Sequence, residues 1–503
     1  MSALSEPSRL RTGIPSFDDI LVGGLPKGEI YLVEGDPGTG KTTLGMQFVL
    51  EGKRQGERCL YVTLAESKSE LEFGAQSHGW SLEGVPIAEF VPEEARLNGE
   101  DQYTIFHPSE VELATTVKKL IAEIERINPE RLVIDSLTEF RLLAQDAIRY
   151  RRQLLALKTY LAGRHTTVLL LDDRTSSSTD LQVHSVVHGV FRLENLLRSY
   201  GVNRRRIEIV KIRGMAYRQG YHDYNVGREG VVIHPRLVAA EHGSDLPEQQ
   251  QLLSSGLAGL DSMFGGGIER GSSTLILGPT GVGKSLMAMQ YAFAAATRGE
   301  RAVLYSFDEA VRTAKARARG LGMQIDPEIK KQHLCLEQID PAELSPGEFV
   351  YRIKREVEEE NTRVIVIDSL NGLRHSMSEE RDLSLQLHEL VVFLAYKNVA
   401  TFVVLTQHGL VGNVYEDIEI SYLADTVLLM RFFEAGASLR RAISALKKRS
   451  GAHELTIREL RIGPDGLHIG EPLTGFKGVL SGTPDFMESQ ELPRGEPGDG
   501  GKR

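Results

Sequence analysis

Two glycine-rich segments of the chain combine the residue types that bind a polyphosphate. Residues 35–42 have the sequence Gly-Asp-Pro-Gly-Thr-Gly-Lys-Thr, and residues 278–285 have the sequence Gly-Pro-Thr-Gly-Val-Gly-Lys-Ser. Glycines let backbone N–H groups approach phosphate oxygens, and the N-terminus of a following helix favours negative charge. A strand–helix turn that is only tightly packed can also be rich in glycine. Two complete motifs, each followed by an acid further along the chain, favour phosphate binding.

Each motif also carries a lysine and a hydroxyl that suit ATP with Mg²⁺. Lys41 and Lys284 would neutralise the β and γ phosphates. Thr42 and Ser285 would each place a hydroxyl on Mg²⁺. The full set of expected ATP contacts is Gly35, Gly38, Thr39, Gly40, Lys41, Thr42 and Thr43, with Gly278, Thr280, Gly281, Val282, Gly283, Lys284, Ser285 and Leu286 in the second motif.

An aspartate ends an apolar segment in each half of the chain. Asp135 follows Arg-Leu-Val-Ile, and Asp368 follows Val-Ile-Val-Ile. A carboxylate at this position would hold Mg²⁺ indirectly, by contacting the groups that bind the ion. An aspartate at the end of a strand can instead cap the next helix. Because each aspartate accompanies a phosphate motif, we expect both to act at the metal.

Cleavage of a γ-phosphate requires a water molecule that is oriented and polarised, and a carboxylate after the second strand is well placed for this task. Glu66, in Thr-Leu-Ala-Glu-Ser, and Glu309, in Ser-Phe-Asp-Glu-Ala, are the candidates. Asp308 precedes Glu309 and is a further candidate base. An acid after a strand can also do no more than cap a helix. Because a glutamate recurs at the same repeat offset, we favour the catalytic role.

Cationic segments lie near the end of each half, at residues 204–214 and 440–451. Their alternating pattern predicts an edge strand with two cations on one face. A charged strand face is often only solvated, and it can protect a sheet edge. Recurrence at matching places favours phosphate contacts, made across a subunit boundary. The cations concerned are Lys211, Arg213, Lys447 and Arg449.

The chain repeats itself once, because the first phosphate motif returns at an offset of 243 residues that also relates Glu66 to Glu309. Apolar runs alternate with helical patterns, which is typical of a parallel sheet covered on both sides. The expected fold class is α/β, with two tandem domains, each a mostly parallel sheet flanked by helices. The predicted strands are 29–33, 60–64, 132–135 and 167–171, then 274–277, 302–307, 364–368 and 401–406, and one predicted helix is 147–162.

A polar segment separates the two halves. Residues 240–251 show no apolar periodicity and lie between regions rich in glycine and β-forming residues. The final residues are rich in Gly, Pro and charge, which predicts a disordered tail. We expect an N-terminal domain over 1–241, a linker over 242–253, a C-terminal domain over 254–485 and the tail over 486–503.

Composition excludes several classes of protein. The 503 residues carry a net charge of -10, so the chain lacks the broad basic field of a dedicated nucleic-acid binder. Cys59 and Cys335 are the only cysteines and lie far apart in sequence, which leaves neither a disulfide framework nor a cysteine zinc site. No apolar stretch approaches the roughly 18 residues of a membrane span. We expect a cytoplasmic protein.

These motifs resemble the KaiC family of double-domain RecA-type ATPases. The resemblance runs from Thr-Gly-Ile-Pro-Ser-Phe-Asp-Asp-Ile-Leu at 12–21 to Val-Leu-Ser-Gly-Thr-Pro at 479–484. It includes both phosphate motifs, both Ile-Asp-Ser-Leu segments, and the Lys-Ile-Arg-Gly and Lys-Lys-Arg-Ser turns. It implies RecA-like P-loop domains in a homohexameric double ring, with ATP at each subunit interface and the four cations reaching the neighbour's nucleotide.

The resemblance also implies a division of labour between the domains. In the family the N-terminal ring is a slow ATPase, and the C-terminal ring phosphorylates and dephosphorylates its own adjacent Ser and Thr residues. Ser421, in segment 416–426, matches the family's serine, but Tyr422 stands where the threonine would be. The family's paired glutamates are here Ala65-Glu66 and Asp308-Glu309. One carboxylate can still orient a water, so we expect ATPase activity in both halves, with protein partners and a role in signalling or clock-like timing.

Two other classes of function compete with this interpretation. A RecA or RadA-type recombinase shares the P-loop, but it would need basic DNA-binding loops, and the net charge of -10 disfavours them. A scaffold ATPase that recruits partners according to its nucleotide state, without kinase activity, is favoured by Tyr422 and disfavoured by Ser421. Phosphate analysis after incubation with Mg-ATP would separate a kinase from such a scaffold.

Overall fold

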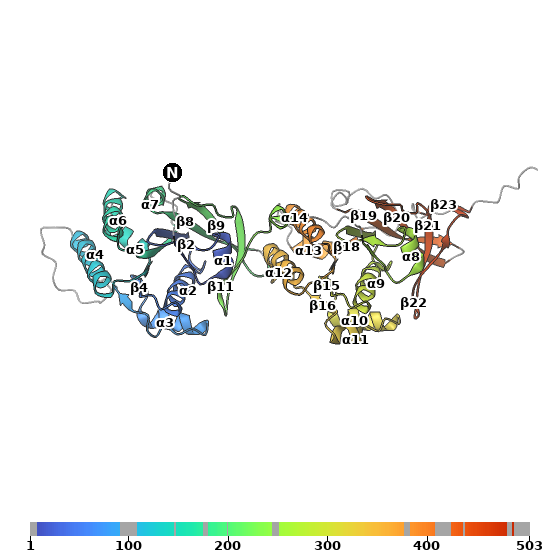
Figure 1. The fold of residues 1–503 in the computed structure, drawn as a ribbon, viewed down its shortest axis with the longest axis horizontal. Helices are drawn as coiled ribbons and strands as arrows, with labels where there is room; N and C mark the ends of the chain where they lie inside the picture. The colour runs from blue at the N-terminus through green and yellow to red at the C-terminus, as the bar shows by residue number, and fades with distance from the viewer. Residues whose placement is uncertain are drawn as a thin grey trace, which may run out of the picture. The chain divides into compact units, whose positions relative to one another are not determined.

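The computed structural model divides the chain into two compact units, Met1–Arg236 and Leu237–Arg503 (Figure 1). The structure describes residues 8–90, 108–144, 147–174, 180–198, 200–243, 251–376, 383–407, 424–435, 438–479 and 485–486. Most of the expected linker and tail lies outside these ranges, and the domain boundaries given above stay a prediction. None of the described helices combines the length and apolar character needed to cross a membrane.

The first unit alternates strands and helices along the chain. Its elements are β1 (Arg9–Leu10), α1 (Pro15–Ile20), β2 (Leu25–Pro26), β3 (Ile30–Gly35), α2 (Lys41–Arg54), β4 (Cys59–Thr63), α3 (Lys68–Ser77), β5 (Ile87–Glu89), α4 (Pro108–Ile127), β6 (Arg131–Asp135), α5 (Leu137–Ala144), α6 (Ala147–Leu161), β7 (Thr167–Asp173), α7 (Asp180–Val186), β8 (Gly189–Leu196), β9 (Arg204–Ile212), β10 (Tyr221–Gly227) and β11 (Gly230–His234).

The second unit repeats this order. Its elements are η2 (Ala239–His242), β12 (Leu252–Leu253), α8 (Ala258–Met263), β13 (Ile268–Glu269), β14 (Ser273–Gly278), α9 (Lys284–Thr297), β15 (Ala302–Ser306), α10 (Val311–Gly320), α11 (Ile325–Lys330), β16 (Leu334–Gln338), α12 (Pro346–Glu359), β17 (Val364–Asp368), α13 (Leu370–Ser376), α14 (Leu383–Tyr396), β18 (Ala400–Thr406), β19 (Thr426–Ala435), β20 (Ser438–Lys448), β21 (Ile457–Gly463), β22 (Gly466–Pro472), β23 (Phe476–Lys477) and β24 (Asp485–Phe486).

Both units contain a nine-stranded sheet of the same design. The strand order is β11-β10-β9-β8-β3-β7-β6-β4-β5 in the first unit and β16-β15-β17-β18-β14-β19-β20-β21-β22 in the second. Pairing is parallel from β8 to β5 and from β16 to β19, and antiparallel in the remaining strands. The predicted α/β class with mostly parallel sheets is confirmed. The eight predicted strands match β3, β4, β6, β7, β14, β15, β17 and β18.

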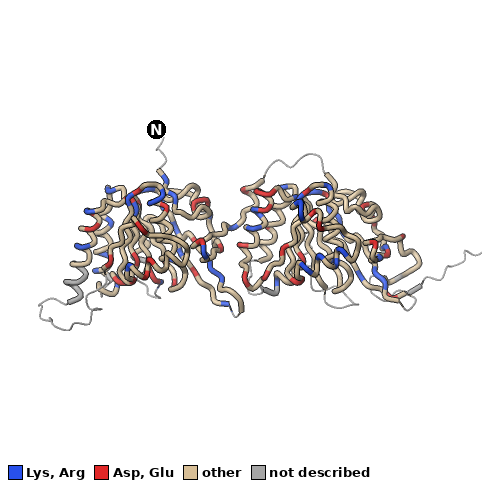
Figure 2. The backbone as a smooth tube through the Cα atoms, turned by 90° about the horizontal axis from the view of Figure 1, so that it is seen from below, with Lys and Arg blue, Asp and Glu red and all other residues tan. Residues whose placement is uncertain are grey.

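Alternating side chains of each central strand feed two separate cores. In β3, Tyr31 and Val33 pack with α1, α2 and α3, whereas Ile30 and Leu32 pack with α4, α5 and α6 on the other face. The sheets of both units are therefore covered on two sides, as the continuous apolar runs indicated. Figure 2 shows cationic and acidic segments interspersed along both units in the described part of the chain.

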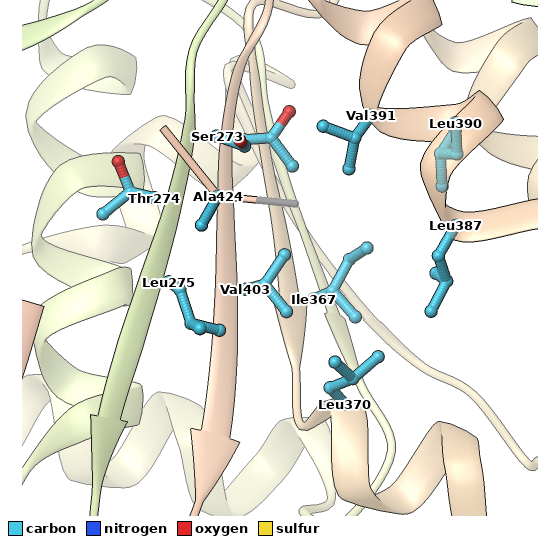
Figure 3. Close-up of a pocket in the computed structure, with 11 residues that line it drawn as sticks. Ser273, Thr274, Leu275, Ile367, Leu370, Leu387, Leu390, Val391, Val403 and Ala424 are labelled. Atoms are coloured by element: carbon cyan, nitrogen blue, oxygen red, sulfur yellow. The ribbon is translucent and has the colours of Figure 1, made fainter. Parts of the chain in front are cut away.

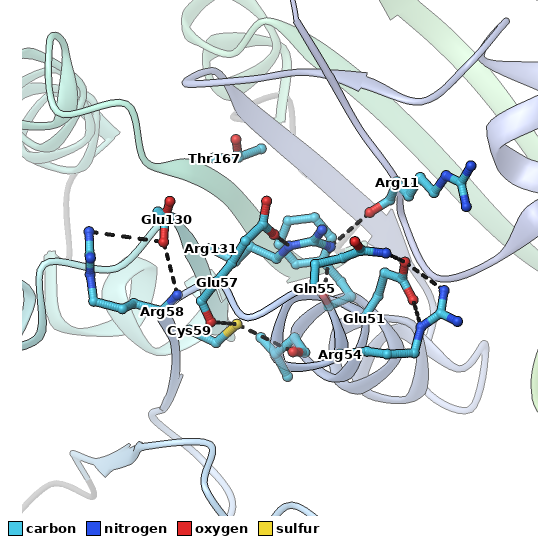
Figure 4. A network of polar contacts seen from close by, with 12 residues as sticks. Arg11, Glu51, Arg54, Gln55, Glu57, Arg58, Cys59, Glu130, Arg131 and Thr167 are labelled. Carbon is cyan, nitrogen blue, oxygen red and sulfur yellow. Dashed lines mark hydrogen bonds and ion pairs between the residues drawn. The ribbon is translucent and has the colours of Figure 1, made fainter.

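A buried arginine lies where β4 and β6 of the first unit meet α2 (Figure 4). Arg131, with 1% of its surface exposed, donates to the carbonyl oxygens of Arg11 at 2.7 Å and Phe48 at 2.9 Å and pairs with Glu57. Gly52 of α2 leaves room for it, because a Cβ there would lie 2.5 Å from both the Arg131 side chain and Cys59 Sγ.

The second unit fills the same place with apolar side chains. Cys59 pairs with Arg131 across β4 and β6, and Ala302 pairs with Val364 across β15 and β17. The repeat offset places Ala295 where the first unit has Gly52. One fold thus accommodates either a satisfied buried charge or compact apolar packing at this point.

The contact around Arg131 predicts that Gly52→Ala destabilises the first unit by about 1–3 kcal/mol, because the added methyl overpacks the site. Alanine would otherwise favour a helix by about 1 kcal/mol over glycine. The measurement is hydrogen exchange of the β4 and β6 amides in the full chain. Gly74→Ala in α3 is the matched control, since a Cβ there meets only Met46 Cε at 3.9 Å. Unchanged exchange in Gly52→Ala would contradict the packing argument.

Candidate functional site

The phosphate loop of the first unit connects β3 to α2. Gly40 adopts the left-handed conformation, with φ 89°, directly before α2, and a Cβ there would lie 3.0 Å from Val226. The Nζ of Lys41 donates to the carbonyl oxygens of Gly35 at 2.7 Å and Asp36 at 3.1 Å. The buried ammonium therefore folds back over the loop, where it can meet the phosphates that the loop would bind.

Two groups from other strands hold this loop. Asp173, the last residue of β7, forms an ion pair with Lys41 Nζ at 2.8 Å. The Tyr224 hydroxyl of β10 donates to the carbonyl oxygen of Thr39 at 2.6 Å, across 185 positions of sequence. The loop is thus tied both to the neighbouring parallel strand and to the antiparallel extension of the sheet.

Asp135 lies beside the hydroxyl expected at the metal. Thr42 Oγ1 donates to Asp135 Oδ2 at 2.8 Å, and the Tyr61 hydroxyl donates to the same oxygen at 2.7 Å. Burial raises the pKa of Asp135, while these hydrogen bonds and the charge of Lys41 oppose the rise. A hydroxyl and a carboxylate next to a phosphate loop supply the oxygen ligands that Mg²⁺ prefers. The residues present therefore fit a magnesium ion.

Glu66 follows β4 and faces the same region. Thr63 Oγ1 accepts from the Glu66 backbone N–H at 3.1 Å and donates to the Glu66 carbonyl oxygen at 2.6 Å, which fixes the turn. Burial and the nearby charge of Asp135 raise the pKa of Glu66. Thr63 is also the register partner of Asp135 in β6. A carboxylate with a raised pKa is a stronger base, and among the described residues no ion pair engages it.

The second unit has the corresponding site in a cavity of about 690 Å³. Lys284 Nζ donates to the carbonyl oxygen of Pro279 at 2.9 Å. Burial lowers the pKa of Lys284 to about 8, against the opposing effect of Asp368. No carboxylate matches Asp173 here, because Thr406 occupies the equivalent position beside the loop. Residues that line the cavity include Thr280, Gly281, Gly283, Lys284, Ser285, Leu286, Asp308, Glu309, Arg317 and Asp368.

The acids of the second site have partners of their own. Burial raises the pKa of Asp368, and a hydrogen bond with the Ser285 side chain opposes the rise. Ser369 Oγ donates to Asp308 Oδ2, and Arg317 Nη2 forms an ion pair with Glu309 Oε2 at 2.9 Å. Ser285 and Asp368 fit Mg²⁺ as Thr42 and Asp135 do. In the second site, however, the nearby carboxylates of Asp308 and Glu309 each contact another side chain.

The cations predicted to cross a subunit boundary contact their own unit in this structure. Lys211 Nζ donates to the carbonyl oxygens of His184 and Val187, and Arg213 Nη2 donates to that of Ser185 at 2.6 Å. Burial, with the charges of Arg213 and Lys158, lowers the pKa of Lys211. The first pair therefore lies at the carboxyl end of α7.

The second pair makes similar contacts. Lys447 Nζ donates to the carbonyl oxygen of Ala424 at 2.7 Å, and Arg449 Nη1 pairs with Asp425 at 3.0 Å. The predicted edge position is wrong for both strands, because β9 lies between β8 and β10, and β20 lies between β19 and β21. Antiparallel strands that the cationic pattern alone could not reveal continue each sheet beyond them.

Sequence reasoning located the loops and the strand-end acids but missed several residues that contact them. Tyr61, Asp173, Tyr224, Ser369 and Arg317 all contact residues of the two sites. Only Asp173 carried a usable signal, since it lies two positions after the predicted apolar strand 167–171. The predicted phosphosite Ser421, with its neighbour Tyr422, lies outside the described residues.

A second cavity of the C-terminal unit has a different character (Figure 3). It measures about 30 Å³ and lies between the sheet and α14, where Leu387 and Leu390 face Ile367 and Val403. These side chains belong to the apolar core on the face opposite α9. Its apolar lining offers no site for a charged ligand, and the phosphate loop remains the candidate site of this unit.

The model of the KaiC ATPase family matches residues 10–238 and 253–474. The chain belongs to this family. It is 27% identical to the circadian clock protein KaiC3 of Synechocystis sp., over 97% of this chain and 96% of that protein. It is 28% identical to the circadian clock oscillator protein KaiC of Acaryochloris marina, over 97% and 93%, and 27% identical to that of Synechococcus elongatus, over 97% and 94%.

The family match covers both units, so the predicted tandem RecA-like domains and the identification as a KaiC-family ATPase are confirmed. Nucleotide binding follows from membership of an ATPase family.

The lowered pKa of Lys284 predicts a pH-dependent affinity for ATP at the second site. Bound phosphates stabilise the ammonium, so binding takes up a proton whenever the free lysine is neutral. Above pH 8, affinity should fall by up to about tenfold per pH unit. Calorimetric titration of the full chain from pH 7 to pH 9.5 would measure this loss. Lys284→Arg, which keeps its charge, should abolish it, and a pH dependence that persists in Lys284→Arg would contradict the assignment.

Proposed function

We propose that the chain is a Mg-ATP-dependent hexameric ATPase whose C-terminal domain also phosphorylates and dephosphorylates its own serine. The observation that carries the proposal is the convergence of a phosphate-loop lysine, a metal-binding hydroxyl, a strand-end aspartate and a glutamate in each unit. A timing role is suggested by relatives named as circadian clock proteins. Regulatory protein partners and a cytoplasmic location belong to the same proposal.

In the first unit, hydrolysis would depend on Lys41, Asp135 and Glu66. Lys41 binds the β and γ phosphates after exchanging its contact with Asp173 for them. Thr42 and Asp135 would hold Mg²⁺, which would supply positive charge against the phosphates. Glu66 orients the attacking water and accepts its proton, a role supported by its raised pKa.

The four cations support assembly into rings. Lys211 and Arg213 correspond in position to Lys447 and Arg449 of the second unit. All four cations donate to oxygen atoms of their own unit. Those oxygens can be replaced by phosphate oxygens of a nucleotide on a neighbouring subunit. ATP would then favour the ring over the monomer by mass action.

Autophosphorylation would take place in the second unit. A serine hydroxyl attacks an in-line γ-phosphate when a carboxylate removes its proton, and Asp308 and Glu309 are the available bases. Ser421 is the acceptor proposed from the sequence. The Tyr422 phenol extends several ångströms further on a rigid ring, so the same geometry would not serve both residues.

A nucleotide-switched scaffold without kinase activity is the second candidate. Tyr422 favours it, because the family's threonine is missing there. The engagement of Asp308 by Ser369 and of Glu309 by Arg317 also favours it, since neither base is unpartnered. A DNA recombinase is a weaker alternative, because the chain carries a net charge of -10.

Removal of each phosphate-loop lysine should separate the activities of the two units. Lys41→Ala should reduce hydrolysis by about a hundredfold and prevent ring assembly, because a buried phosphate contact is lost. Lys284→Ala should leave most hydrolysis and mainly abolish phosphorylation. The measurements are phosphate release and light scattering with and without Mg-ATP. Equal losses in both variants, or an unaltered chain that stays monomeric in Mg-ATP, would contradict the proposal.

Incubation with Mg-ATP should place phosphate on Ser421 alone. Tryptic mass spectrometry would compare the unaltered chain with Ser421→Ala and Glu309→Gln, both of which should lack the phosphate. Tyr422→Phe is the matched control and should retain it. Phosphate that persists in Ser421→Ala, or never forms in the unaltered chain, would leave the scaffold ATPase as the better account.

A further inference from the structure

The two candidate catalytic glutamates differ in what faces them. Glu309 forms an ion pair with Arg317 of α10 at 2.9 Å, and both side chains line the cavity of the second site. The Arg317 side chain is 35% exposed and that of Glu309 is 22% exposed, so the pair is partly screened from solvent. The guanidinium also helps to oppose the raised pKa of Asp368. Its charge therefore acts on the acids of this site.

The first unit has no side chain at the matching position. The repeat offset of 243 residues places Gly74 of α3 where the second unit has Arg317. Among the described residues Glu66 has no ion pair, and Asp135 contributes further negative charge beside it. The turn that carries each glutamate is otherwise the same, because Thr63 and Ser306 hold Glu66 and Glu309 through equivalent hydrogen bonds.

An ion pair changes what a carboxylate can do in hydrolysis. As water attacks the γ-phosphorus, the bond from phosphorus to the ADP oxygen breaks, ADP leaves with the electron pair, and the water's proton passes to the carboxylate. A guanidinium that pairs with the carboxylate competes with the attacking water for the carboxylate oxygens. It also holds the carboxylate oxygen in an orientation set by α10.

We propose that Arg317 is a positioning residue that restrains Glu309 and makes the second site the slow hydrolase, whereas Gly74 leaves Glu66 available to activate water at the first site. This inference rests on the proposed function, in which the two glutamates orient the attacking water. The difference in hydrolysis rate between the two units would then depend on one position, which is Gly74 on α3 and Arg317 on the equivalent helix α10. A slowly hydrolysed ATP in the second unit is retained long enough to serve as a phosphate donor.

The test at the second site uses the full chain in a Glu66→Gln background, which keeps the first phosphate loop and its lysine intact for assembly. Arg317→Gly should raise kcat about tenfold, because the Glu309 carboxylate is freed from its ion pair and can orient the attacking water. Arg317→Lys should stay slow. The equilibrium affinity for a non-hydrolysable ATP analogue with Mg²⁺ should change less than about threefold, which separates an effect on the base from loss of binding.

The reciprocal test is made in a Glu309→Gln background. Gly74→Arg should lower kcat at the first site about tenfold, because a guanidinium at this position can pair with Glu66 as Arg317 pairs with Glu309. Gly74→Ala and Gly74→Gln are matched controls for helix propensity and side-chain bulk, and both should keep the original rate. A Cβ at Gly74 meets only Met46 Cε, at 3.9 Å.

Two results would overturn the inference. A fall in hydrolysis in Arg317→Gly would show that the guanidinium assists the reaction, as a contact to phosphate would. An unchanged rate in both swapped variants would show that the pair does not restrain the base. A different result would show that the proposed function itself is wrong. If Glu66 and Glu309 do not activate water, hydrolysis will survive in the double variant Glu66→Gln with Glu309→Gln.

Discussion

A buried carboxylate at the end of an inner parallel strand has to be satisfied, and this requirement organises both sites. Asp135 receives hydrogen bonds from Thr42 at the start of α2 and from Tyr61 on the adjacent strand. Asp368 is held in the same way by Ser285. The register of β4 with β6 and of β15 with β17 then sets Glu66 near Asp135 and Glu309 near Asp368. In each unit one strand pairing and the helix after the phosphate loop therefore bring a hydroxyl, an aspartate and a glutamate together.

Duplication has preserved this backbone while the polar groups around it diverged. Lys41 is neutralised by Asp173, whereas Lys284 is buried without a matching acid and has a lowered pKa. The Arg131 cluster in one core corresponds to alanines and a valine in the other. Since the sheet order is the same in both units, such exchanges alter the chemistry without altering the fold.

The sequence was most informative where function depends on neighbours along the chain. The loop motifs, the strand-end acids and the central strands follow local rules, and their positions were confirmed by the structure. The cationic strands were placed at an edge because their order in the sheet depends on distant pairings. Arg317 was missed for a related reason, because its contact with Glu309 depends on how α10 packs after the turn.

The hydrogen bond from Tyr224 to Thr39 links the phosphate loop to a strand made 185 residues later. The loop, the strand before it and the helix after it all emerge early from the ribosome, but this contact cannot form until β10 has been synthesised and added to the sheet. Contacts of such high sequence separation form late and slowly. The first nucleotide site is therefore completed only when almost the whole N-terminal unit has been made, and a nascent chain that stops before β10 carries the motif without the finished loop.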